Sequence, residues 1–78
     1  MTLKDTILNN TSYIDSITCN DELKRRFLDL GLIKGTAISP ILKSPLGDPI
    51  AYEFRGNIIA IRNDEAKKIL VNSAPSEI

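Results

Sequence analysis

Apolar residues recur along this chain with two spacings, one typical of strands and one typical of helices. Between residues 50 and 54 they alternate with smaller or charged residues, which is the two-residue period of a strand with one buried face. Gly56-Asn57 can form a two-residue turn, and residues 58–62 continue as an isoleucine-rich run. The segment from 50 to 62 therefore predicts a β-hairpin.

The turn at Gly56-Asn57 also predicts which residues face each other in this hairpin. On the apolar face it pairs aromatic with aliphatic residues, Phe54 with Ile59 and Tyr52 with Ile61. On the other face Glu53 and Arg62 become diagonal neighbours that can form an ion pair. We therefore expect Arg62 to help hold the hairpin register.

The helical spacing is clearest between Asn20 and Gly31. Asn20 is a good N-cap, and the next two residues are acidic, which suits the exposed amide groups of a first turn. One apolar stripe is predicted, formed by Leu23, Phe27 and Leu30. Gly31 can take the left-handed conformation that ends a helix, and Leu32 can fold back as in a Schellman motif. The opposite face carries Lys24, Arg25 and Asp29.

Two further strands are expected to be irregular. Residues 13–18 favour a strand, but Ile14 and Ile17 are three positions apart, which breaks the alternation and indicates a bulge or a bend. Lys34-Gly35 is a turn that leads into a strand over 36–43. Pro40 lies inside that strand and cannot donate a ladder hydrogen bond, so it must sit at an edge or a bulge.

Short elements complete the pattern. Residues 3–8 favour a helical turn with Leu3, Ile7 and Leu8 on one side, residues 63–68 a helical turn capped by Asn63, and residues 69–71 a last strand. About five strands with one or two short helices predict a mainly β fold, a small and partly open barrel. We expect a single domain over residues 1–72 and a flexible tail over 73–78.

Size and charge narrow the functions that such a barrel can have. The 78 residues carry ten basic and ten acidic side chains, so the net charge is zero, whereas binding to a phosphate backbone needs a basic surplus. There are only four aromatic residues, and two belong to the predicted core, which leaves no stacking platform for bases. The longest apolar run is far below the roughly 20 residues of a membrane helix. These features argue against nucleic-acid binding and direct membrane insertion.

The residues that usually carry catalysis are missing. The chain has no histidine, which removes the commonest general base and zinc ligand. The four glycines all stand at predicted turns rather than in a phosphate-binding loop. Cys19 is the single cysteine, so an internal disulfide is excluded and a reducing cytosol is favoured; we expect a small half-buried thiol rather than a reactive one. The sequence therefore predicts a protein that is not an enzyme.

Acidic and basic clusters have ordinary structural explanations. Asp21-Glu22 and Asp64-Glu65 both stand at helix starts, where they complement the helix dipole. No cofactor is expected, although weak binding of a divalent metal by carboxylates stays open. Two interpretations remain for the basic residues of this region. They form one positive patch, or they lie on a solvated face where nearby acidic residues balance them: Lys24, Arg25, Arg26, Lys34 and Lys43.

Several segments, taken in order, resemble the FeoA family. They are residues 25–35, with the sequence RRFLDLGLIKG, the segment Pro45-Leu46-Gly47-Asp48-Pro49, Gly56, residues 60–62, Ala66 and residues 69–71. The resemblance covers residues 2–71 in the order and spacing of the family. It implies an SH3-like small β-barrel, in which Gly31 and Gly35 take backbone angles that other residues resist.

The resemblance also implies a partner. FeoA proteins are small cytosolic accessories of bacterial ferrous iron uptake that bind or regulate FeoB, a membrane permease with a cytosolic GTP-binding domain. We therefore expect a cytoplasmic protein that its partner recruits to the inner face of the membrane. The alternative is a divalent-metal-binding or metal-sensing domain, because the same domain type occurs in metal-dependent repressors.

Two surfaces are candidates for contact with the permease. One is the segment 45–49, in which two prolines stiffen the chain and Leu46 is the apolar residue. Leu46 either serves as an anchor for a partner pocket or folds back to plug the end of the barrel. The other surface is the helix face with Arg25 and Arg26. A homo-oligomer formed through an exposed strand edge is a further option, although Pro40 argues against the edge of its own strand.

Overall fold

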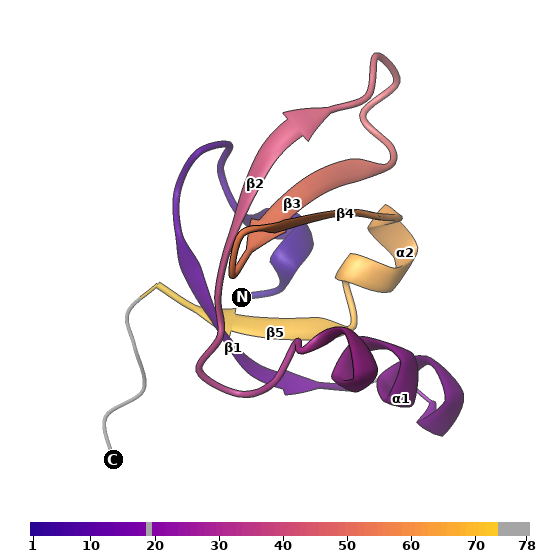
Figure 1. Cartoon of the computed structure of the whole chain (residues 1–78). Coiled ribbons are helices and arrows are strands. Elements are labelled where there is room, and N and C mark those ends of the chain that lie inside the picture. Colours follow the sequence, from indigo (N-terminus) through magenta and orange to yellow (C-terminus); the bar gives the residue numbers. More distant parts are fainter. Residues whose placement is uncertain (19, 74–78) are drawn as a thin grey trace.

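The computed structural model describes residues 1–18 and 20–73, and in them one antiparallel five-stranded sheet carries two short helices (Figure 1). The strands are paired in the order β4-β3-β2-β1-β5. Their bounds are β1 Ser12–Ile17, β2 Ala37–Lys43, β3 Ile50–Phe54, β4 Asn57–Ile61 and β5 Ile69–Asn72. Because β4 and β5 do not pair, the sheet is not closed. The fold is the partly open barrel that the sequence predicts.

Helical elements and the inner face of the sheet form one core. The helices are α1, Asp21–Leu30, and α2, Asn63–Ala66, and a 3-10 turn, η1, spans Leu3–Asp5. Leu3, Phe27 and Ala66 carry side chains from η1, α1 and α2 into this core. The other buried apolar residues of the core come from the strands and from the turn that follows α1: Ile14, Ile17, Leu32, Ile38, Ile50, Tyr52, Phe54, Ile61, Ile69 and Val71.

Both predicted strand irregularities are confirmed. The register of β1 against β5 shifts between Ile14 and Ser16, and that of β2 against β3 shifts between Pro40 and Leu42. The pairing of β1 with β2 involves only Ser12 and Tyr13 on the β1 side, so Pro40 lies beyond it. Its missing N–H is therefore tolerated in a strand that lies inside the sheet.

The ends of α1 form as predicted, but its apolar stripe differs. Asn20 accepts the N–H of Leu23 at 2.9 Å, and after Gly31, with φ of 97°, the N–H of Leu32 donates to the Phe27 carbonyl at 3.0 Å. This is the backbone bond of a Schellman motif. Leu30 is 43% exposed and lies outside the core, so its predicted place in the stripe is wrong. Leu32 is buried instead, because the Gly31 turn brings it back towards the helix.

The 50–61 hairpin forms, but in another register than predicted. Arg55 and Gly56 have positive φ, 50° and 79°, so the two-residue turn lies one position earlier than Gly56-Asn57. Tyr52 consequently faces Ile59, and Phe54 faces Asn57. Each partner has moved by two residues, so the same side chains still face the core.

The change of register also removes the expected ion pair. Glu53 faces Ile58 in the structure, and Arg62 lies four residues further on, after the end of β4. Arg62 instead precedes α2, where its carbonyl oxygen accepts the N–H groups of Glu65 and Ala66 at 3.0 and 2.8 Å. Arg62 therefore contributes to the start of α2 and does not pair with Glu53.

The remaining boundaries differ by small amounts. The predicted turn over residues 3–8 is reduced to η1, and Ile7 and Leu8 are 69% and 38% exposed because the chain leaves the core after Leu3. The predicted strand over 13–18 begins and ends one residue earlier. Asn63 is the first residue of α2 rather than its cap. The predictions for Cys19 and for the tail beyond Ser73 lie outside the described residues.

Candidate functional site

The 45–49 loop, which connects β2 to β3, is closed by hydrogen bonds at its base. The N–H of Gly47 donates to the Ser44 carbonyl at 2.8 Å. Both the N–H, at 3.2 Å, and the hydroxyl of Ser44 donate to the carbonyl oxygen of Pro49. The loop is therefore a closed turn with internal support, as its proline and glycine content predicts.

The same loop is joined to the start of α2 by a single residue. Asn63 donates its side-chain N–H to the Gly47 carbonyl at 3.0 Å and its backbone N–H to Asp48 Oδ1 at 2.9 Å. A helix start has backbone N–H groups without partners inside the helix, and a carboxylate is a preferred acceptor for them. Asp48 therefore caps α2 from a distant part of the chain.

Leu46 stands at the tip of this loop and is 95% exposed. Of the two alternatives, the structure shows the exposed one, because a side chain that plugged the barrel would be buried. Its neighbours in the loop, Pro45, Asp48 and Pro49, are exposed too, and Gly47 is half-buried. All five predicted loop residues thus form one surface with a single large apolar side chain.

Two unpartnered polar atoms lie on the residues that neighbour this loop in space. The Tyr52 hydroxyl is buried without a hydrogen-bond partner among residues 1–18 and 20–73, and so is Asn63 Oδ1. Burial, together with the negative charge of Asp48, raises the pKa of the Tyr52 phenol to about 12. The phenol is therefore neutral at physiological pH.

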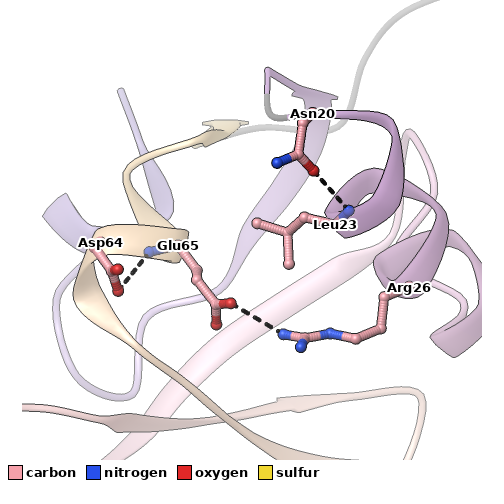
Figure 2. A network of polar contacts seen from close by, with 5 residues as sticks. All are labelled: Asn20, Leu23, Arg26, Asp64 and Glu65. Carbon is pink, nitrogen blue, oxygen red and sulfur yellow. Dashed lines mark hydrogen bonds and ion pairs between the residues drawn. The ribbon is translucent and has the colours of Figure 1, made fainter.

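The second predicted surface is the exposed face of α1, where Arg26 is held by α2. Arg26 Nη2 and Glu65 Oε2 are 3.1 Å apart, and Figure 2 shows the two side chains reaching towards each other from α1 and α2. The Arg26 guanidinium also lies 5.5 Å from the centre of the Phe27 ring. A cleft of about 510 Å³ between the two helices is lined in part by Arg25, Arg26 and Glu65.

The five cations of the predicted basic patch do not gather in one place. Lys24 and Lys34 line a separate hollow, which also contains Asp15. Lys43 ends β2, close in sequence to the 45–49 loop. Only Arg25 and Arg26 share the cleft beside α2. The fold therefore separates the basic residues. This agrees better with a solvated surface balanced by nearby acidic residues than with a single positive patch.

The two surfaces are connected through α2. This four-residue helix holds the 45–49 loop through Asn63 and α1 through Glu65. Neither contact has a local sequence signal, because Asp48 and Asn63 are 15 positions apart and Arg26 and Glu65 are 39 apart. The sequence analysis proposed these two surfaces as candidates and did not predict that α2 joins them.

The carboxylates and glycines occupy structural positions. Asp64 Oδ1 accepts the N–H of Glu65 at 3.1 Å, as drawn in Figure 2, within the first turn of α2. Gly31 and Gly35 have φ of 97° and 88°, the left-handed conformation expected of them. In residues 1–18 and 20–73, no group of three or more histidine, cysteine, aspartate or glutamate side chains could hold a metal ion.

The described part of the chain contains no helix of sufficient length and hydrophobicity to span a membrane.

Comparison with known proteins gives consistent matches over nearly the whole length. The family model for the FeoA domain matches residues 1–73. A Campylobacter jejuni protein named "Putative Fe(2+) transport protein A" is 33% identical over 72 residues, which is 92% of this chain and 97% of the relative.

Solved structures with the same fold include two FeoA proteins. The Chlorobium tepidum FeoA protein has a TM-score of 0.87 and 30% identity, covering 92% of this chain and 69% of that protein. The Stenotrophomonas maltophilia FeoA complexed with zinc, described as a prokaryotic SH3 domain protein, has a TM-score of 0.84 and 30% identity, covering 96% and 93%. The SH3-like architecture implied by the sequence resemblance is therefore confirmed.

Proposed function

The chain belongs to the FeoA family, which is associated with ferrous iron transport, and from that premise we propose that it is a non-catalytic accessory protein that binds the cytosolic part of a FeoB-type permease. The observation that carries this proposal is the exposure of Leu46, 95%, at the tip of a hydrogen-bonded loop. An apolar side chain held in water by an ordered turn is suited to a pocket on a partner.

The order of the loop favours binding. Ser44, Gly47 and Asn63 hold the 45–49 loop through hydrogen bonds before any partner arrives. A preorganised loop loses little conformational entropy on association, so more of the contact energy is available as affinity. Leu46 is therefore the anchor in this proposal, and the polar groups around it provide orientation.

Arg25 supplies the second contact. Arg26 is partly neutralised by Glu65, whereas Arg25 is exposed and has no ion pair among the residues that the structure describes. An exposed guanidinium favours an acidic surface on the partner and steers the encounter more than it adds affinity. The proposed interface therefore has an apolar anchor at one end of α2 and a cation at the other.

The absence of catalysis is supported by residue chemistry. The sequence has no histidine, and the acidic pair of α2 is engaged in hydrogen bonds and an ion pair with neighbouring groups. These two carboxylates thus have structural roles, which argues against their acting as an acid–base pair.

Titration of the purified protein against the full permease and against its isolated GTP-binding domain tests the proposal. We expect binding to at least one of them, and Leu46→Asp should weaken it at least about tenfold, because burying an unpaired carboxylate in an apolar pocket is unfavourable. Leu42→Asp is the matched control, since Leu42 is 65% exposed but lies on the outer face of the sheet. Equal loss in both variants, or in neither, removes the loop from the interface.

A further inference from the structure

The strand β4 forms an edge of the sheet that the described residues leave uncovered. It pairs with β3 only. Its sequence, NIIAI, contains no charged residue and no proline, and Ile58 is 63% exposed. Natural edge strands usually carry a lysine, a proline or a bulge that prevents pairing with other chains. None of these devices is present in β4.

The other terminal strand of the sheet, β5, is covered by the N-terminal residues. The N–H of Val71 in β5 donates to the Met1 carbonyl at 2.9 Å, and Thr2 forms a bridge with Leu70. The first two residues thus run along β5 and occupy its outer edge. Among the described residues, the terminal strand β5 is therefore covered by the chain itself, and β4 is the terminal strand that remains open to a further strand.

The hairpin turn determines which groups β4 presents at this edge. A two-residue turn at Arg55-Gly56 makes Phe54 and Asn57 a hydrogen-bonded pair, and such pairs recur at every second residue. Ile59 and Ile61 therefore bond to β3. Ile58 and Ala60 direct their N–H and C=O groups away from β3, and both residues are exposed. The open edge offers two donors and two acceptors.

We infer that β4 pairs with β4 of a second copy of this chain, antiparallel, about a two-fold axis at Ile59. In this register Ile58 of one copy lies opposite Ala60 of the other, and the four edge groups of each copy are satisfied by four shared hydrogen bonds. The large Ile58 side chain meets the small Ala60, so the outer face packs without a clash. No like charges meet along the strand, and the zero net charge of the chain adds no long-range repulsion.

The pairing of two β4 strands extends a row of apolar residues on the outer face of the sheet and stops at two copies. Leu42, Ala51 and Ala60 are cross-strand neighbours on the outer face, and the second copy adds its Ile58 to this row. Because Met1 and Thr2 already cover β5, the dimer leaves no terminal strand open among the described residues, so this pairing does not grow into a fibre.

The interface between the two β4 strands is small, so the dimer should form only at high protein concentration. Pairing of one five-residue strand belongs to the class below about 1,200 Å², typical of weak association. The register also brings Arg62 beside the turn of the second copy, which carries Arg55. These like charges repel, so added salt should strengthen the dimer.

Two measurements on the full chain test the inference. In sedimentation, the average mass should rise from the 8.6 kDa monomer towards twice that value between about 10 µM and about 1 mM, and rise further with salt. In amide exchange by NMR, Ile58 and Ala60 should exchange fast in dilute samples and become protected on concentration. Monomer mass at 1 mM, or fast exchange of both amides there, overturns the inference.

Variants at the edge separate this dimer from other self-association. Ala60→Pro removes an N–H that points away from β3, so the hairpin should fold while the dissociation constant rises at least tenfold; Ala60→Ser is the control and should dimerise. A second test does not depend on proline. A protein with Ile58→Lys and Ala60→Lys, and one with Ile58→Glu and Ala60→Glu, should each be monomeric and should form a heterodimer when mixed. A wild-type dimer with no heterodimer in the mixture contradicts the proposed register.

Discussion

Asp48 and Asn63 lie 15 positions apart in the chain, and Asp48 Oδ1 accepts the backbone N–H of Asn63 at 2.9 Å. The helix that begins at Asn63 has only four residues, so it has little hydrogen bonding of its own. Its start is instead stabilised by a side chain from the 45–49 loop. Loop and helix therefore depend on each other for their conformation.

Asp48→Ala should destabilise the fold by about 1 kcal/mol, because the replacement leaves the Asn63 N–H without its acceptor. Asp48→Asn keeps an acceptor oxygen and should lose less. Urea denaturation measures both values through the midpoint. Asp29→Ala, an exposed substitution on α1, is the control and should change stability by less than about 0.5 kcal/mol. An equal loss in the control would show that the cap has no special role.

The Arg26–Glu65 ion pair should contribute a small and salt-dependent coupling. The two side chains are 59% and 22% exposed, so a double-mutant cycle with Arg26→Gln and Glu65→Gln should give about 0.2–1 kcal/mol. The coupling should fall in 1 M salt as screening shortens to roughly 3 Å. The cycle with Arg25→Gln in place of Arg26→Gln should give no coupling, and a value as large as that for Arg26 would contradict the geometry.

Protein stability should fall between pH 10 and pH 12 because of Tyr52. The phenol has a pKa of about 12 in the folded protein, raised by burial and by Asp48, against an ordinary value of 10.0. Below pH 10 both states are protonated and the stability is complete. Between these values the unfolded chain loses the proton first, so stability falls with rising pH, by at most about 1.4 kcal/mol per pH unit.

Tyr52→Phe isolates this effect from the other groups that titrate in alkali. At pH 7 the variant should be as stable as the wild type, or more stable by up to about 1 kcal/mol, because the lost hydroxyl is buried and has no hydrogen-bond partner in the part of the chain that the structure describes. Above pH 10 it should lose less stability than the wild type. Parallel stability curves for the two proteins across pH 10–12 would show that Tyr52 does not titrate as inferred.

Calorimetric titration with Mn²⁺ addresses the metal-sensing alternative. We expect dissociation constants of about 1 mM or weaker, because no group of three suitable ligands occurs in residues 1–18 and 20–73 and the sequence lacks histidine. Micromolar binding would favour the alternative. Cys19→Ser would then show whether the thiol takes part.

Features of this fold that depend on neighbouring residues could be predicted, and the hairpin register shows where such signals become ambiguous. Asn20 and Gly31 mark the ends of α1 correctly, and the spacing at Ile14 predicts its bulge. At the hairpin, Arg55-Gly56 and Gly56-Asn57 give registers that place the same side chains on the core face. The sequence pattern favoured the second, because arginine seldom takes the left-handed conformation that Arg55 adopts.

For the candidate site too, the features that depend on neighbouring residues could be predicted, and the contacts between distant segments could not. Proline and glycine content identified the 45–49 loop as an ordered turn, and the structure decided that Leu46 points outward. The contacts that hold the loop and Arg26 to α2 depend on how distant segments meet. Such contacts follow from the complete topology, so inspection of neighbouring residues does not find them.

The length of α2 has a consequence for partner selectivity. Because this helix fastens the Leu46 loop at one end and, through Arg26, α1 at the other, the spacing between the loop and the helix that carries Arg25 is set within the monomer. A binding surface that accommodates both must match that spacing, so an SH3-like domain with a longer insertion between its last two strands would be rejected even if it kept the same leucine and arginine. Discrimination among similar barrels would then depend on a distance rather than on residue identity.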